Sequence, residues 1–271
     1  MSHYSVTPMP RPQAWIKPIE FPECPPGWRT GPPDFVGVGV QRSGTTWWYR
    51  GAIRPHPRVA KGNGTGKELH FFDRFWPGAE TKYTLEDYHR LFPRPPGKIT
   101  GEWTPRYLAD AWALEMLRRV APEARILVML RDPVARFMSG VAHARKRWNG
   151  WGEPLELSEL SDALWRGFYH VQLRRLFELF PREQVLVLQY ERCVAETMRE
   201  LRRTTDFLGI EPYDEPPARL DKHVQAKAAS FKPELTPELR EELIARYRDD
   251  VARLAALCPE IDVELWPNFR D

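Results

Sequence analysis

The sequence predicts an α/β domain in which helices cover both faces of a central parallel sheet. Short apolar runs at residues 34–40, 125–130 and 185–189 are typical of buried strands, and stretches with helical spacing separate them. Strands that alternate with helices usually form parallel sheets with both faces covered, which fits runs that are apolar throughout. A length of 271 residues is sufficient for one such domain with a full core.

Composition and charge exclude several other classes of protein. Charged residues make up 28% and hydrophobic residues 42% of the chain, as in an ordinary soluble globular protein. A formal net charge of +3 is too small to indicate a nucleic-acid partner. The longest aliphatic run, residues 126–130, is far below the roughly 20 residues that a membrane span needs. The 3 cysteines lie far apart and no apolar signal segment opens the chain, so we expect a cytoplasmic protein.

Proline marks the first boundary. Nine of the 27 prolines fall within residues 8–33, a density that opposes both helix and sheet. We therefore predict a proline-rich N-terminal arm over residues 1–33 and a single domain over residues 34–271.

Within the domain, the pattern predicts each helix in turn. Asp132 and Pro133 are typical of an N-cap residue and of the first helical position. The predicted helices cover residues 45–53, 107–119, 132–147, 161–180, 195–208 and 236–257. Ligands of parallel sheets bind beyond the carboxyl ends of the strands, so residues 41–46 and Arg131 are expected at one common edge.

The stretch from Gly39 to Thr46 has the spacing of a phosphate-binding loop. It follows a strand and opens a helix, so backbone N–H groups and the helix dipole converge on one anion site. The spacing G-x-x-x-x-G-K-[ST] is kept except that Thr45 stands where nucleotide triphosphatases have lysine, while Arg42 offers a cation inside the loop. The fold is therefore predicted to be P-loop-like; the alternative is a tight turn that uses glycine for geometry alone.

A second anion site is predicted at the neighbouring strand. Arg131 ends the strand at residues 125–130, and Ser139 lies two helical turns further on, near the same face. A guanidinium and a hydroxyl together can hold a phosphate. Two separated phosphate sites at one edge indicate a nucleotide that is phosphorylated at both ends.

An ordered set of motifs over roughly residues 35–210 supports one family. The chain resembles the sulfotransferases that depend on 3′-phosphoadenosine 5′-phosphosulfate (PAPS), and more narrowly the branch with the heparan sulfate N- and 3-O-sulfotransferases. The matching segments are residues 41–46 (QRSGTT), 67–73 (KELHFFD), 102–107 (EWTPRY), 131–133 with Ser139, 167–173, 180–188 and 207–209.

The resemblance implies a role for each site residue. Arg42 would hold the bridging oxygen of the 5′-phosphosulfate, and Arg131 with Ser139 would bind the 3′-phosphate. Glu68 would be the catalytic base, with His70 as the competing base. The other donors toward PAPS would be Ser43, Gly44, Thr45 and Thr46.

Sulfuryl transfer requires that the acceptor lose one proton while charge is stabilised on the leaving group. Glu68 can accept that proton provided that a partly apolar site raises the pKa of its carboxyl group, and Phe71 and Phe72 are expected to supply that environment. The alternative for Glu68 is a plain ion pair with Lys67 or an arginine, and the alternative for His70 is a histidine that is hydrogen-bonded or lines the acceptor site.

The sequence also departs from the heparan relatives. Their Glu-Lys-[ST]-Pro motif has Trp103 at its lysine position here, so we expect a cation near the sulfuryl group to be missing. The relatives' basic C-terminal loop is not clear either, and residues 222–233, with Lys227 and Lys232, are predicted to contact the nucleotide in its place. We also expect the relatives' membrane anchor to be missing, and therefore a soluble, bacterial member.

The acceptor is predicted to be a hydroxyl of a glycan, a glycolipid or a secondary metabolite, with an amine less favoured and with no metal, nucleic acid or membrane span involved. Two other functions stay open. A P-loop kinase or triphosphatase would turn over ATP with magnesium, and a non-catalytic binder of nucleotides or glycans would not need Glu68.

Overall fold

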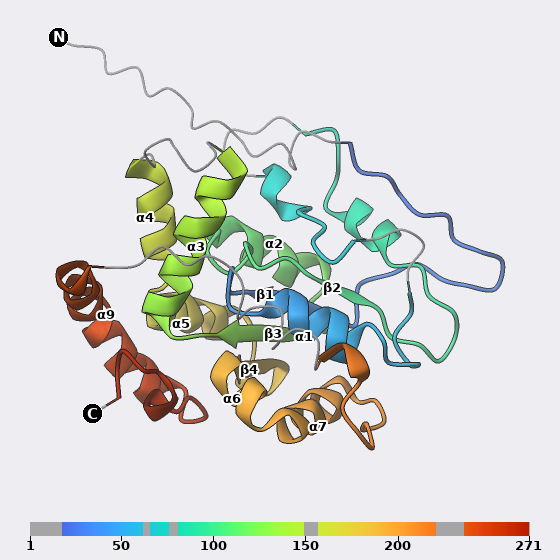
Figure 1. Ribbon diagram of the computed structural model, residues 1–271. Coiled ribbons are helices and arrows are strands. Elements are labelled where there is room, and N and C mark those ends of the chain that lie inside the picture. Colours follow the sequence, from blue (N-terminus) through green and yellow to red (C-terminus); the bar gives the residue numbers. More distant parts are fainter. Residues whose placement is uncertain (1–17, 62–65, 76–80, 149–156, 221–235, 271) are drawn as a thin grey trace, which may run out of the picture.

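The computed structural model describes residues 18–61, 66–75, 81–148, 157–220 and 236–270. It confirms the α/β class: four strands form one parallel sheet in the order β2-β1-β3-β4 (Figure 1). The strands are β1 (Phe35–Gly39), β2 (Gly101–Trp103), β3 (Arg125–Leu130) and β4 (Val185–Gln189). The three-residue β2 was not predicted, because so short a strand carries no periodic signal.

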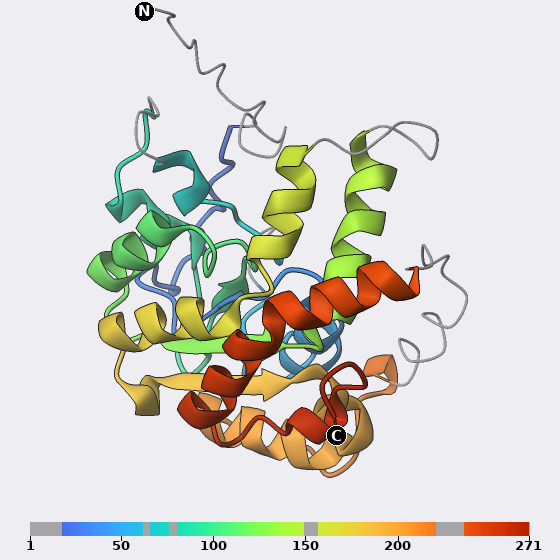
Figure 2. The same ribbon diagram turned by 90° about the vertical axis from the view of Figure 1, so that its left-hand side faces the viewer.

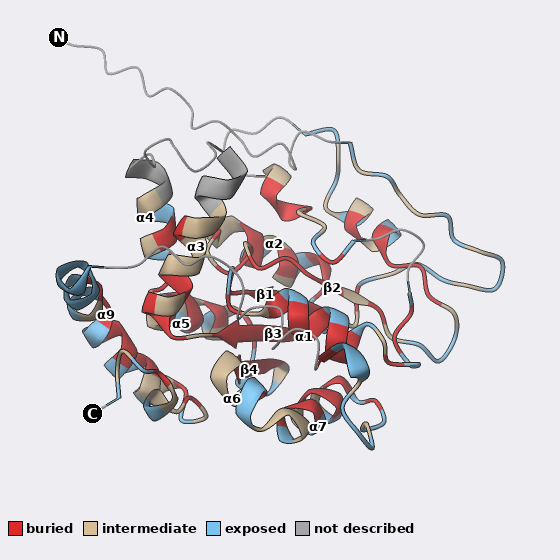
Figure 3. Ribbon diagram, in the orientation of Figure 1, coloured by how far each residue is buried: buried red, intermediate tan, exposed pale blue. Residues whose placement is uncertain are grey.

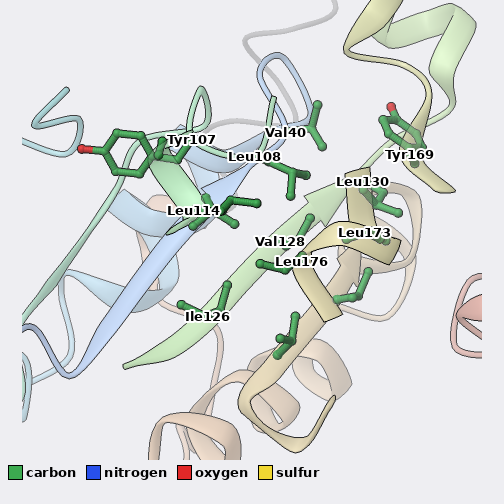
Figure 4. Packing of buried hydrophobic residues seen from close by; sticks show 14 of the residues in the cluster. Val40, Tyr107, Leu108, Leu114, Ile126, Val128, Leu130, Tyr169, Leu173 and Leu176 are labelled. Carbon is green, nitrogen blue, oxygen red and sulfur yellow. The ribbon is translucent and has the colours of Figure 1, made fainter. Parts of the chain in front are cut away.

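Alternate strand residues bury two cores, one on each face of the sheet. On one face, Val128 and its neighbours pack against α2 (Ala111–Val120) and α5 (Tyr169–Leu179), as Figure 4 shows. Helix α9 (Pro237–Leu257) packs on the outside of α5 (Figure 2). On the other face, Met129 and its neighbours pack against α1 (Thr45–Trp48), α6 (Tyr190–Ala195) and α7 (Thr197–Leu208). Strands β1 and β4 are therefore buried throughout and β3 is buried after its first residue, whereas α9 exposes its outer side (Figure 3).

Helix boundaries differ from the prediction mainly where side chains interrupt the backbone pattern. The helix predicted over residues 161–180 is two helices, α4 (Leu157–Trp165) and α5, since Gly167 packs against the ring of Tyr247 where a Cβ atom would lie 2.6 Å away. The Gln172 amide donates to the carbonyls of Trp165 (3.2 Å) and Phe168 (2.8 Å), which fixes this break.

The remaining elements agree with the prediction in part. Helix α2 begins at Ala111 instead of the predicted residue 107, because residues 105–109 form turns, and α6 and the short 3₁₀ helices were not predicted. Helix α3 (Pro133–Trp148) begins at Asp132, whose Oδ1 accepts from the N–H groups of Val134 (2.9 Å) and Ala135 (3.1 Å), so the predicted N-cap is confirmed. Helix α1 continues as a π-helix, Tyr49–Ile53. The short 3₁₀ helices are Phe72–Phe75, Glu86–Leu91, Arg182–Gln184 and Val263–Leu265. No helix in the described ranges is long and apolar enough to cross a membrane.

The described part of the proline-rich arm, residues 18–33, contains no helix or strand beyond one bridge between Arg29 and Arg94. The Ile19 N–H donates to the Tyr83 hydroxyl at 2.8 Å, and the Arg90 guanidinium lies 3.9 Å from the centroid of the Phe21 ring. This half of the arm therefore lies along the surface of the domain; the boundary at residue 33 stays a prediction.

Candidate active site

The predicted phosphate loop connects β1 to α1 at the carboxyl edge of the sheet. Within it, the Ser43 N–H donates to the Val40 carbonyl (3.2 Å), and Gly44 has φ 94°. A Cβ atom on Gly44 would lie 2.5 Å from the Tyr190 ring, so this position needs glycine for both backbone conformation and space. Tyr190 directly follows β4, and the loop is thereby packed against the end of a second strand.

The two predicted anion sites meet at this edge. The Arg42 Nε donates to Ser139 Oγ at 3.1 Å, and an N–H of Arg131 lies 3.4 Å from the Arg42 carbonyl oxygen. Burial and the nearby Arg131 lower the pKa of the Arg42 guanidinium, because two cations face each other in a partly desolvated place. An anion between them would relieve this repulsion.

Two buried polar atoms at this edge have no hydrogen-bond partner in the described part of the chain. They are Ser43 Oγ and Arg131 Nε. Arg131 is nevertheless held in place, since its guanidinium lies 5.0 Å from the Tyr190 ring centroid and its carbonyl accepts from the Tyr169 hydroxyl at 2.7 Å. Unpaired buried donors cost free energy until a ligand satisfies them. Both atoms can donate to the oxygens of an anionic ligand.

A cluster of opposite charges lies beside the loop. His70 Nδ1 is 2.5 Å from Asp73 Oδ2, and its Nε2 is 3.4 Å from Glu68 Oε2. The Lys67 ammonium donates to Glu68 Oε1 at 2.8 Å. Burial alone would lower the pKa of His70, but its hydrogen bonds to Asp73 and Glu68 raise the pKa to about 9. The imidazole is therefore charged at neutral pH and bridges two carboxylates.

The expected elevation of the Glu68 pKa is wrong. Burial would raise it, but the hydrogen bond from His70 and the contacts with Lys67 lower the pKa of Glu68 to about 2. Phe71 and Phe72 do not line the carboxylate; they are fully buried and pack on the Tyr88 ring, with centroids at 5.1 and 4.6 Å. The ion pair with Lys67, weighed as the alternative for Glu68, is present, and His70 is fully hydrogen-bonded.

Arg42 and His70 share a backbone feature. They are the two non-glycine residues in the described ranges with positive φ, at 72° and 50°. L-residues adopt this conformation at a cost of roughly 1–2 kcal/mol each, and such strain concentrates at functional sites. Both residues were predicted to lie in the site, and the strain independently marks them.

Glu102 supports the charged cluster and was quoted in the sequence only as part of a motif. Its fully buried carboxylate accepts from the Tyr88 hydroxyl (2.8 Å), the Tyr107 hydroxyl (3.1 Å) and the Leu69 N–H (3.1 Å). Burial raises its pKa, as expected for a carboxyl group in the core. The Leu69 contact fixes the backbone between Glu68 and His70. The sequence signal that could have indicated this role of Glu102 is the aromatic residue and the hydroxyl residue that follow it, Trp103 and Thr104.

The C-terminal segment packs against Asp132, the residue that follows Arg131. The sequence analysis did not predict this contact. Asp132 Oδ2 accepts from both the backbone N–H (3.1 Å) and the side-chain amide (2.8 Å) of Asn268. Glu191 accepts from the Asp132 N–H (3.1 Å) and from the Trp266 indole (3.0 Å), and burial raises the pKa of Glu191 to about 7. The start of α3 is thus anchored to the last residues of the chain.

Comparison with known proteins identifies the family. A profile described as the sulfotransferase family matches residues 82–215. Heparan sulfate glucosamine 3-O-sulfotransferase 6 of Homo sapiens is 31% identical over 195 residues, which cover 68% of this chain and 54% of that protein. Heparan sulfate glucosamine 3-O-sulfotransferase 3B1 of Mus musculus is 30% identical over 189 residues, or 66% and 46% of the two chains. The solved sulfotransferase from Alicyclobacillus acidocaldarius has 28% identity and a TM-score of 0.69, and the match covers 86% of this chain and 98% of that one.

The chain belongs to the sulfotransferase family.

This sulfotransferase spans about half the length of the curated relatives it matches. The profile begins at residue 82, so the phosphate loop and Glu68 precede it. Lys227 and Lys232, predicted as nucleotide contacts, lie outside the described residues.

The expected lack of a cation near the sulfuryl group stays a prediction, but Lys67 brings a cation to the phosphate loop. Its ammonium donates to Thr45 Oγ1 at 3.0 Å, and Thr45 occupies the loop position where triphosphatases have lysine. Trp103 is fully buried, as its indole donates to the Gly39 carbonyl at 3.0 Å. A lysine from another segment of this sulfotransferase therefore reaches the loop, which no spacing pattern within the loop can predict.

Proposed function

We propose that this sulfotransferase transfers the sulfuryl group of PAPS to a hydroxyl group. The acceptor class that we favour is a sugar hydroxyl of a glycan or glycolipid. The observation that carries the proposal is the 3.1 Å contact between Arg42 Nε and Ser139 Oγ, which joins two anion sites 97 residues apart in the sequence. The similar curated proteins are named for sulfating an oxygen of glucosamine, which favours a sugar hydroxyl over a small metabolite or an amine.

In this proposal the loop residues Ser43, Gly44, Thr45 and Thr46 bind the 5′-phosphosulfate together with Arg42. Arg131 and Ser139 bind the 3′-phosphate. Bound PAPS supplies a sulfur atom whose bond to the phosphate oxygen breaks as the acceptor oxygen bonds to it, and adenosine 3′,5′-bisphosphate leaves with the electron pair. Arg42 stabilises the charge that develops on that oxygen.

Glu68 is the proposed base. With a pKa of about 2 its carboxylate is ionised at neutral pH and ready to accept the acceptor's proton. A carboxylate of so low a pKa is a weak base, but the acceptor hydroxyl becomes acidic only as its oxygen bonds to sulfur, so the proton moves late. His70 carries a proton at neutral pH and is excluded as the base by its own charge; with Asp73 it orients Glu68.

The decisive test is thermal stabilisation by adenosine 3′,5′-bisphosphate and, separately, by ATP, both without magnesium. The wild type, Arg131→Ala and the control Arg202→Ala, an exposed arginine on α7, are compared. A ligand at a hundredfold excess over Kd stabilises by about 2.7 kcal/mol, a shift of roughly 5–10 °C for a chain of this size. We expect this shift with the bisphosphate for the wild type and the control, and its loss in Arg131→Ala. Stabilisation by ATP alone would reject the proposal in favour of a kinase.

We also propose that the reaction needs no metal and takes place in the cytoplasm. Arg42, Lys67 and Arg131 provide positive charge at the site, and Cys24, Cys193 and Cys258 are free thiols, as is usual in a reducing compartment. Transfer that survives EDTA would support the first proposal. Detection of the protein in the soluble fraction of its host, with its thiols reduced, would support the second.

A further inference from the structure

The feature at issue is a buried lysine that lies between the phosphate loop and the proposed base. Lys67 has a side chain only 4% exposed, and burial lowers the pKa of its ammonium. Its Nζ is 3.0 Å from Thr45 Oγ1 and 2.8 Å from Glu68 Oε1. An ammonium is costly to bury, and it has three N–H donors of which these two acceptors use two. Within the described chain, its third donor has no recorded acceptor.

Lys67 and Trp103 are structural neighbours. The backbone N–H of Trp103 donates to the Lys67 carbonyl at 2.8 Å, so β2 holds the backbone of Lys67 in place. The Trp103 ring packs directly on Gly37 of β1, where a Cβ atom would lie only 2.1 Å from it.

The position of Lys67 also suits the reaction, and this step rests on the proposed function. In an in-line transfer, sulfur lies between the leaving oxygen, held at the loop, and the acceptor oxygen, which loses its proton to the base. A cation in contact with a loop residue and with the base is adjacent to the path between them. We propose that the Lys67 ammonium binds the sulfuryl oxygens of PAPS.

The test compares two ligands that differ only in the sulfuryl group. Calorimetry measures the Kd of PAPS and of adenosine 3′,5′-bisphosphate for the wild type, Lys67→Met, Lys67→Arg and the exposed control Lys98→Met. We expect Lys67→Met to bind the bisphosphate within about threefold of the wild type but PAPS about ten- to a hundredfold more weakly, the range of one charged hydrogen bond. Lys67→Arg should recover part of the PAPS affinity. Bisphosphate binding also reports that each variant is folded.

A double variant separates direct contact from an effect through Glu68. Without Lys67, the Glu68 carboxylate itself could repel the sulfuryl group. PAPS affinity is therefore compared between Glu68→Gln and Lys67→Met/Glu68→Gln. If Lys67 touches the sulfuryl group, the double variant still binds PAPS at least tenfold more weakly than Glu68→Gln. Equal affinities, or an equal loss for both ligands in Lys67→Met, would overturn the inference. A wild type that binds neither ligand would instead refute the proposed function.

Discussion

The two halves of the candidate site differ in how their charges are satisfied. In the nucleotide half, Arg42 and Arg131 are like charges side by side, and buried atoms of Ser43 and Arg131 lack hydrogen-bond partners among the described residues. In the base half, Glu68 and His70 are bound at both ends by opposite charges. One half is arranged to be completed by an anionic ligand, whereas the other is already neutralised within the chain.

This difference indicates in which half mutations should affect ligand binding and in which half they should affect catalysis. The unpaired donors in the nucleotide half gain hydrogen bonds when a phosphate binds, so substitutions there should mainly change the affinity for the nucleotide. The base half gains little from the nucleotide, so changes there should appear mainly in the rate. Lys67 is the one described residue that hydrogen-bonds to both halves.

The largest expected effect is that of Glu68→Gln on the rate. The amide keeps the size of the side chain but cannot accept the acceptor's proton, and general-base catalysis contributes typically 10²–10⁴-fold. We expect kcat for sulfate transfer to a sugar hydroxyl to fall by about that factor while bisphosphate binding changes less than threefold. Initial rates with radiolabelled PAPS and calorimetry measure the two quantities.

The matched control is Glu115→Gln, an exposed glutamate of α2 that pairs with Arg175 away from the site. It should retain full activity. If Glu68→Gln were as active as this control, the base would lie elsewhere and the division into two halves would fail.

The next largest effect is that of Arg42→Gly, which separates stability from affinity. Glycine accepts the φ of 72° without strain, so the relief of roughly 1–2 kcal/mol offsets the added entropy of the unfolded chain. We expect the free energy of unfolding in urea to stay within about 1 kcal/mol of the wild type, while PAPS binds at least about tenfold more weakly. A large loss of stability would show that Arg42 is structural, and unchanged affinity would remove it from the nucleotide half.

The nucleotide half was predicted from the sequence more completely than the base half, for a physical reason. Phosphate loops and strand ends are local patterns, so residues 41–46 and the N-cap at Asp132 were predicted in place. The state of Glu68 depends on contacts that no local pattern encodes. The Phe71 and Phe72 rings face the core instead of the carboxylate, and the neighbouring Lys67 and His70 control its pKa.

The fold shows the same division. Buried strands of five and six residues were predicted from their apolar composition, whereas the three-residue β2 was missed. The break at Gly167 was also missed, because it is set by the Tyr247 ring on a helix 80 residues further along the chain. Packing between distant segments decides both features.

The smallest expected effect concerns the charge on His70. Its folded-state pKa of about 9 lies above the ordinary value of 6.5, so its contribution to stability is complete below pH 6.5 and disappears as the pH rises through 9. At 1.36 kcal/mol per pKa unit, partly offset by exposure, this is on the order of 1–3 kcal/mol. We expect the difference in unfolding free energy between the wild type and His70→Gln to shrink by that amount between pH 6.5 and 9.5.

The groups that face His70 determine how this titration is interpreted. Glu68 and Asp73 both contact its ring nitrogens, while Lys67 contacts Glu68 from the other side. A constant difference between wild type and His70→Gln up to pH 9.5 would mean that the folded protein holds a neutral imidazole. Such an imidazole could accept a proton at neutral pH, and His70 would return as the competing base. A shrinking difference leaves Glu68 as the proton acceptor, with His70 and Asp73 holding it in place.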